Sequence, residues 1–173
     1  MSVETFSLTT ARLRLREMTL DDAPFIVDLL GDAAFKRYIG DKRVRNRPQA
    51  CKYLQAGPLA SYRDFGFGLW LVVQRQDDRP VGMCGLLKRP TLDDVDLGFA
   101  LMPEFRGRGY CLEAATAVLQ FGQQRFGLRR IVAIVQPDNE RSVKVLLRLG
   151  MQPERLLRLG DDPREVQLLA WQA

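Results

Sequence analysis

The sequence predicts an α/β domain built on a mixed sheet, and three observations favour this fold class. Alternating or β-branched runs are typical of strands, and runs of helical period separate the later strands. Along the chain, a meander of strands is followed by strand–helix–strand–helix–strand. With 173 residues, 46% of them hydrophobic, and no repeat or linker, we expect a single domain over residues 1–173.

The first elements are predicted from alternation and capping. RLRLR at 12–16 alternates strictly, which indicates a half-buried strand. Thr19 and Asp22 resemble a helix cap with an acid in the first turn, so we expect a helix over 21–30 that ends near Gly31.

The next stretch is less regular. Residues 32–66 have a helical pattern that is broken by prolines and a glycine, and this segment is expected to contribute to an acceptor pocket. Residues 68–87 are typical of two strands joined by the polar turn QDDRP. The interrupting residues are Pro48, Gly57 and Pro58.

The second half alternates between strands and helices. We expect a strand over 94–102 that ends at Pro103, and then a helix over about 109–125. The β-branched run at 128–136 is compatible with a buried parallel strand.

The last helix and two closing strands complete the predicted order. Asn139 is a candidate cap for the helix over 140–149, and Gly150 occupies the usual position after a helix end. Closing strands are expected at roughly 152–159 and 164–171.

Composition narrows the classes of function. The net charge of +5 weakly favours a phosphorylated or polyanionic partner. Because the chain has no histidine, histidine triads and histidine metal sites are excluded, and no metal is expected. Three scattered cysteines fit a reducing cytoplasm, and no apolar run or leader suggests a membrane or secretion. The cysteines are Cys51, Cys84 and Cys111, and we expect them to pack as small hydrophobic side chains.

The stretch RGRGYC at 106–111, called the glycine loop below, comes between a predicted strand and a predicted helix. Gly107 and Gly109 permit positive φ and close approach of a ligand, and the helix start favours a diphosphate. Arg106 and Arg108 can add charge-assisted contacts. The run lacks the G-x-G-x-x-G and P-loop patterns. Taken alone, the loop is explained equally well as a phosphate site or as a plain turn that connects the strand to the helix.

Five segments follow the pattern of one known family in its order, from about residue 8 to 171. They are TARLRLREMTLDDA, RPVGMCGLL, DLGFAL, RGRGYC and PDNERSVKVLLRLGM. Together they resemble the GNAT superfamily of acyl-CoA-dependent N-acetyltransferases, and in particular its RimJ/RimL-like branch. Cys111 replaces the final Gly or Ala of the family's [RQ]-x-x-G-x-[GA] turn. The resemblance implies a central mixed sheet splayed between two parallel strands, with helices on both faces.

The resemblance also implies acetyl-CoA as co-substrate and an amine as acceptor. Pantetheine would pair with the strand edge, and the diphosphate would meet backbone N–H groups of the glycine loop. Asn139 matches a CoA-contacting asparagine, although a plain helix cap is its alternative role. The implied cofactor-binding residues are Phe99, Ala100, Leu101, Arg106, Gly107, Arg108, Gly109, Tyr110, Asn139 and Ser142.

For catalysis, the resemblance points to Asp96 as base, direct or through water, and to Ser142 as donor of a proton to the leaving thiolate. Leu146 stands where many relatives carry a tyrosine acid, so that acid is absent. An ordinary helix-start hydroxyl is the alternative role for Ser142. Alternative bases are Asp93, Asp94, Glu104 and Glu165.

Several functions stay open on the sequence alone. The acceptor is expected to be a protein N-terminal amine, a polyamine or a small amine; an acidic cleft would favour polyamines and an open groove would favour peptides. A non-catalytic acyl-CoA-binding regulatory domain is the alternative. An RNA-binding or ribosome-binding module is a weaker one, because the arginines are spread and nucleic acid is not expected. A homodimer is possible. Those arginines are Arg129, Arg130, Arg141, Arg148, Arg155 and Arg158.

Overall fold

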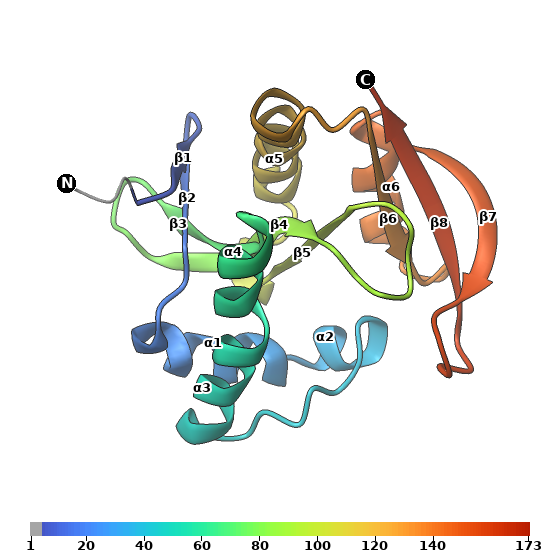
Figure 1. Ribbon diagram of the computed structural model, residues 1–173. Helices are drawn as coiled ribbons and strands as arrows, with labels where there is room; N and C mark the ends of the chain where they lie inside the picture. The colour runs from blue at the N-terminus through green and yellow to red at the C-terminus, as the bar shows by residue number, and fades with distance from the viewer. Residues whose placement is uncertain (1–4) are drawn as a thin grey trace.

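An eight-stranded mixed sheet forms the centre of the computed structural model, which describes residues 5–173 (Figure 1). The strand order is β1-β2-β3-β4-β5-β6-β8-β7, and among the strands of the described residues only the neighbours β5 and β6 run parallel. The expected domain over 1–173 also includes residues 1–4, which lie outside the described residues. The strands are β1 (Ser7–Thr9), β2 (Leu13–Arg16), β3 (Leu69–Gln74), β4 (Pro80–Leu87), β5 (Asp96–Leu101), β6 (Arg130–Val135), β7 (Gln152–Arg158) and β8 (Glu165–Gln172).

Helices cover both faces of this sheet, which confirms the predicted fold class. The first four helices pack on one face, and α5 and α6 lie on the other (Figure 1). No helix within residues 5–173 has the length and apolar character needed to cross a bilayer. The helices are α1 (Ala23–Gly31), α2 (Ala33–Tyr38), α3 (Arg47–Ala56), α4 (Pro58–Phe65), α5 (Tyr110–Phe126) and α6 (Glu140–Arg148), with short 3-10 turns η1 (Leu20–Asp22) and η2 (Pro103–Phe105).

The alternation of β3 explains how one sheet supports two cores. Trp70 and Val72 point into the core shared with α5, whereas Leu69, Leu71 and Val73 point into the core shared with α1 and α3. Successive side chains of a strand face opposite sides, so a fully apolar strand must lie in the middle of a covered sheet. All six residues of β3 are buried, as this position requires.

The sheet separates between its two parallel strands. Strand β4 pairs with β5 along its length, from Gly82 opposite Leu101 to Leu87 opposite Asp96. By contrast, β5 and β6 pair only where Asp96 lies opposite Val132. Beyond this point the two strands diverge, and the edge of β5 that faces β6 has no strand partner within the described residues. The splayed parallel pair implied by the resemblance is confirmed.

Several local predictions also hold. Thr19 and Asp22 form a reciprocal capping box, and Asp22 Oδ2 accepts a 2.8 Å hydrogen bond from the Thr19 N–H. The 68–87 hairpin and both closing strands are present. Pro48 lies in the first turn of α3 rather than interrupting a helix, because its missing N–H costs nothing there.

Two differences concern strands. The short edge strand β1 was not predicted, since three residues carry too little pattern. The strand expected over 94–102 is limited to β5, because Arg130 binds Asp94 by a 3.0 Å ion pair outside the ladder and Met102 already leads into η2.

Candidate functional site

The glycine loop connects η2 to α5 and has the backbone conformation that its glycines predicted. Gly107 and Gly109 have φ values of +75° and +79°, which side chains with a Cβ rarely adopt. Gly109 is the N-cap of α5, and within residues 5–173 no side chain caps this 17-residue helix. Its first N–H groups therefore lack both intrahelical and side-chain partners at the positive end of the helix dipole, an arrangement suited to an anion.

The two arginines of the loop have different environments. Arg106 Nη2 donates to Asp32 Oδ2 at 2.6 Å and to the Leu101 carbonyl at 2.9 Å. The Arg106 N–H donates to the Pro103 carbonyl at 3.2 Å, so both its amide and its guanidinium already have partners. Arg108 is exposed, and its guanidinium carbon lies 5.8 Å from the centre of the Phe105 ring. Arg106 therefore braces the loop against α2, while Arg108 stays accessible.

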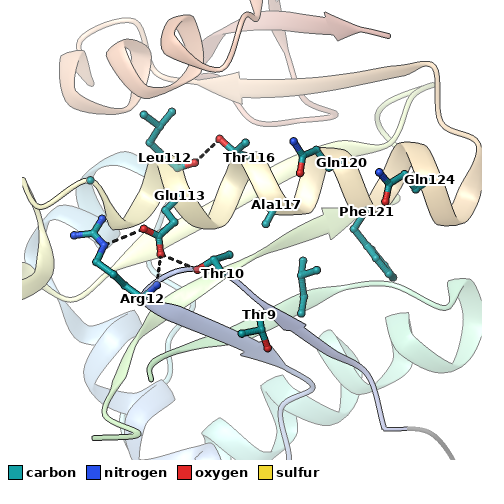
Figure 2. Close-up of a pocket in the computed structure, with 12 residues that line it drawn as sticks. Thr9, Thr10, Arg12, Leu112, Glu113, Thr116, Ala117, Gln120, Phe121 and Gln124 are labelled. Carbon is teal, nitrogen blue, oxygen red and sulfur yellow. Dashed lines mark hydrogen bonds and ion pairs between the residues drawn. The ribbon is translucent and has the colours of Figure 1, made fainter. Parts of the chain in front are cut away.

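A second brace holds the loop to the turn between β1 and β2 (Figure 2). Arg12 Nε pairs with Glu113 Oε1 at 2.9 Å, and Arg12 Nη1 donates to the Arg108 carbonyl at 2.9 Å. Thr10 Oγ1 and the Arg12 N–H both donate to Glu113 Oε2, at 2.7 and 3.1 Å. The Arg12 guanidinium also stacks 4.4 Å above the Tyr110 ring. These contacts fix the start of α5 against the turn between β1 and β2, which comes much earlier in the chain.

A cavity of about 420 Å³ lies at the opening between β5 and β6, and it brings several predicted residues together. Asp96 and Phe99 from β5 line it, as do Asn139 and Ser142 at the start of α6. Ala100 and Leu101 do not line it; they continue β5 toward the glycine loop. Residues 106–110 are also outside its lining, so the loop and the cavity are separate parts of the candidate site.

Asp96 is fully buried, and Arg89 Nε lies 3.1 Å from both of its carboxylate oxygens. Burial raises the pKa of Asp96, and the attraction of Arg89 lowers it by less, so the net pKa lies above the usual value. A carboxylate with a raised pKa takes up a proton more readily, which suits a general base. None of the four alternative carboxylates lines the cavity.

The start of α6 places a hydroxyl at the cavity. Asn139 is the N-cap, as predicted, and its Oδ1 accepts a 3.3 Å hydrogen bond from the Ser142 N–H. Within residues 5–173 the Ser142 hydroxyl forms no hydrogen bond, so it is free to serve a ligand. Leu146 follows one turn later and is buried at the same cavity.

The cysteines have the packing roles that were expected, and the two tryptophans also pack in the core around α5. Cys84 and Cys111 face the core around α5, and burial raises the pKa of Cys111 to about 12, which opposes thiolate formation. Trp70 is 1% exposed and stacks on Phe6, while Trp171 packs at the edge of the same core. In the described part of the chain, no cluster of three or more potential ligands could hold a metal ion.

The cavity also contains residues that the sequence did not single out. Segment 32–66 contributes aromatic side chains there, as expected, but charged groups join them from three places in the chain. No sequence signal marks these charges, because only the fold brings them together. They are Lys42, Arg89, Asp162 and Arg164, beside Phe35, Tyr38 and Tyr53.

Comparison with known proteins agrees with this architecture. Residues 12–152 match the family described as "Acetyltransferase (GNAT) domain". YoaA of Bacillus subtilis, an uncharacterized N-acetyltransferase, is 30% identical over 87% of this chain and 85% of its own. The chain therefore belongs to the GNAT acetyltransferase family.

Solved structures share the fold at lower identity. An acetyltransferase from Agrobacterium tumefaciens superposes with a TM-score of 0.84 and 24% identity, over 100% of this chain and 98% of that one. RimL, a ribosomal L7/L12 α-N-protein acetyltransferase solved in complex with coenzyme A, gives a TM-score of 0.82 at 19% identity, over 96% and 98%. These neighbours show that the chain shares their fold.

Proposed function

We propose that this protein transfers the acetyl group of acetyl-CoA directly to an amine. The amine nitrogen attacks the thioester carbonyl, the new C–N bond forms, the C–S bond breaks, and coenzyme A leaves as the thiol. The observation that carries the proposal is the separation of β5 and β6 beside an uncapped helix start with two left-handed glycines. RimL, which shares this fold, was solved with coenzyme A.

In this proposal the glycine loop holds the diphosphate. The amides from Gly107 to Tyr110 and the exposed Arg108 side chain supply the main donors, because the Arg106 N–H donates to the Pro103 carbonyl. Arg106 Nη2 binds Asp32 and the Leu101 carbonyl, whereas its Nε and Nη1 form no hydrogen bond within residues 5–173 and can add a contact. Pantetheine then runs along the unpartnered edge of β5 at Phe99, Ala100 and Leu101, as a strand adds to a sheet edge. The edge directs the thioester toward the cavity.

At the cavity, Asp96 is the proposed base and Ser142 the proposed proton donor. The base receives the proton of the amine through an intervening water, because Arg89 occupies both carboxylate oxygens. Ser142 then gives its proton to the departing thiolate sulfur and is reprotonated through water by the proton that Asp96 received, so both groups return to their starting states. Holding both substrates in one cavity replaces a bimolecular encounter. Asn139 supports Ser142 by capping the same turn.

The wider assignments belong to the same proposal. We place the enzyme in the cytoplasm as a single catalytic domain, with acetyl-CoA and an amine as its partners and no resident metal. A homodimer is compatible with this proposal. The pairing of Asp96 with Arg89 favours one rival, an acyl-CoA-binding domain without turnover.

Thiol release from acetyl-CoA in the presence of an amine panel tests the proposal. Release that depends on the amine, with a mass gain of one acetyl group on it, is the expected result. Tight binding of acetyl-CoA with no product from any amine would support the regulatory domain. Salt-dependent RNA binding that survives loss of Gly109 would favour the RNA-binding module.

A further inference from the structure

The charged side chains that line the cavity include more cations than anions. Three cationic side chains, Lys42, Arg89 and Arg164, line it, against the two carboxylates of Asp96 and Asp162. We call these three side chains the cationic cluster. Asp96 binds Arg89, and Asp162 binds Arg164 with Oδ2 to Nη2 at 2.6 Å. Within residues 5–173, Lys42 is left without an ion pair.

The members of the cluster come from separate parts of the fold but lie close together. A Cβ built on Gly40 would be 3.5 Å from Arg164 Nη2, so Arg164 rests against the main chain two residues before Lys42. Although Lys42 as a whole residue is exposed, its pKa is lowered, first because protein atoms displace water from its ammonium group and then because Arg89 and Arg164 repel its charge. Attraction by Asp162 raises this pKa by less. A bound anion would relieve this repulsion.

A neutral donor lies beside these cations. Tyr53 lines the same cavity, and its hydroxyl forms no hydrogen bond within the described residues. Burial raises the pKa of Tyr53 to about 12, so the hydroxyl keeps its proton at neutral pH and can donate it. A cation and a free hydroxyl that line the same cavity form a suitable set of donors for a carboxylate.

We propose that the acceptor is a small amine that also carries a carboxylate, which the cationic cluster and Tyr53 bind while the amine faces Asp96 and Ser142. The inference rests on the proposed acetyl transfer and names its substrate class. A polyamine would place positive charge against Lys42, which costs binding free energy. The cavity of about 420 Å³ is near the lower end of small-molecule pockets and must also admit the thioester, so a peptide chain fits it poorly.

The first experiment compares acceptors that have a carboxylate with acceptors that lack one. Purified protein and acetyl-CoA are mixed with each of the common L-amino acids, with its amide, with spermidine, or with C-terminally amidated tripeptides, and thiol release is measured. The expected result is a kcat/KM at least about tenfold higher for the best amino acids than for their amides, because the carboxylate adds charge-assisted hydrogen bonds. Equal or better transfer to the amides, spermidine or peptides overturns the inference while the acetyltransferase stands. No transfer to any amine overturns both.

The second experiment tests the cluster itself. Lys42→Met is expected to raise KM for the best amino acid about tenfold and to leave KM for its amide and for acetyl-CoA unchanged, whereas Lys42→Arg retains most of the affinity. Lys52→Met is the matched control, since Lys52 is exposed on α3 and outside the cavity. An unchanged KM in Lys42→Met, or an equal loss for acid and amide, contradicts the inference. Thermal unfolding of each variant identifies any loss of fold.

Discussion

The glycine loop and the cationic cluster, two separate parts of the candidate site, differ in how the chain builds them. The loop is one continuous stretch in which Gly107, Arg108 and Gly109 are exposed and Tyr110 is buried. The cluster is assembled from the segment after α2, the segment after β4 and the turn before β8. Backbone recognition at a helix start tolerates few changes, whereas side chains on loops can change one at a time. The comparison therefore predicts a constant cofactor end and an adjustable acceptor end.

The largest effect is expected at the cofactor end. Gly109→Glu places a carboxylate where the diphosphate is proposed to lie, and its Cβ would lie 3.3 Å from Arg12 Nη2. We expect affinity for coenzyme A, measured by isothermal titration calorimetry, to fall by about 100-fold or more.

Gly127→Glu is the matched control for this variant. Gly127 also has a positive φ, +65°, but it follows the other end of α5 and has no atom within 4 Å of a built Cβ. Backbone strain is similar in both variants, so only the position relative to the ligand differs. Equal losses of affinity would contradict the placement of the diphosphate.

The next effect concerns the base. Asp96→Asn removes the proposed proton acceptor, so kcat is expected to fall by about 100-fold while KM for acetyl-CoA stays unchanged. Glu165→Gln, which changes an exposed carboxylate outside the cavity, is expected to have no effect. A wild-type kcat in Asp96→Asn would exclude Asp96 as the base.

Asp96 also predicts the pH dependence of activity. A base acts when deprotonated, so kcat/KM is expected to rise with pH as Asp96 loses its proton. Burial raises the pKa of Asp96. The acidic limb of the profile is therefore expected above the range of an ordinary aspartate, about 3.9, and this limb is expected to disappear in Asp96→Asn.

A moderate effect is expected from the brace behind the loop. Glu113→Gln weakens the contacts with Thr10 and Arg12, so the free energy of unfolding is expected to fall by about 1–2 kcal/mol at pH 7. Affinity for coenzyme A is expected to weaken as well, because the brace positions the start of α5. The exposed Arg14–Asp78 pair provides the control, and Asp78→Asn is expected to cost less than about 0.5 kcal/mol.

The brace has a defined pH dependence. Burial raises the pKa of Glu113. Hydrogen bonds from Thr10 and Arg12 lower it by a larger amount, so the net pKa lies below the usual value. Its stabilisation is therefore present above the usual glutamate pKa and is lost as pH falls through the lowered value. Urea unfolding at several pH values is expected to show wild type and Glu113→Gln converging below about pH 4. A constant difference would contradict the role of the Glu113 charge.

The smallest effect is expected at Ser142. Ser142→Ala removes the proposed proton donor but keeps the cap, because Asn139 binds the Ser142 N–H rather than its hydroxyl. We expect kcat to fall about tenfold with no change in stability. Thr116→Ala on α5, whose hydroxyl donates to the Leu112 carbonyl, is the control and is expected to keep wild-type kcat. Equal kcat values in the two variants would contradict the role of Ser142 as proton donor and leave it with a structural role in the helix.

The contrast between a continuous loop and a cluster assembled from distant segments also explains which features could be predicted from the sequence. The mixed sheet, the 68–87 hairpin, the Thr19 capping box and the left-handed glycines follow from local patterns, since period and φ depend on nearby residues. The order of motifs also placed Asn139 and Ser142 at the start of a helix, where the structure has them.

What the sequence could not indicate depends on contacts between distant segments. The ion pair between Arg106 and Asp32 joins residues 74 positions apart, so the occupied side chain of Arg106 was not predictable from the loop alone. The pairing of Asp96 with Arg89 and the approach of Arg164 to Gly40 likewise arise only after folding. Charged residues in surface segments carry no local pattern that marks them as members of one cavity.

A crystal structure of the protein with coenzyme A tests the central claim most directly. The account predicts diphosphate oxygens within hydrogen-bonding distance of the amides from Gly107 to Tyr110, with pantetheine along β5 and the thiol directed toward Ser142. Coenzyme A bound away from this loop, with the opening between β5 and β6 empty, would contradict it.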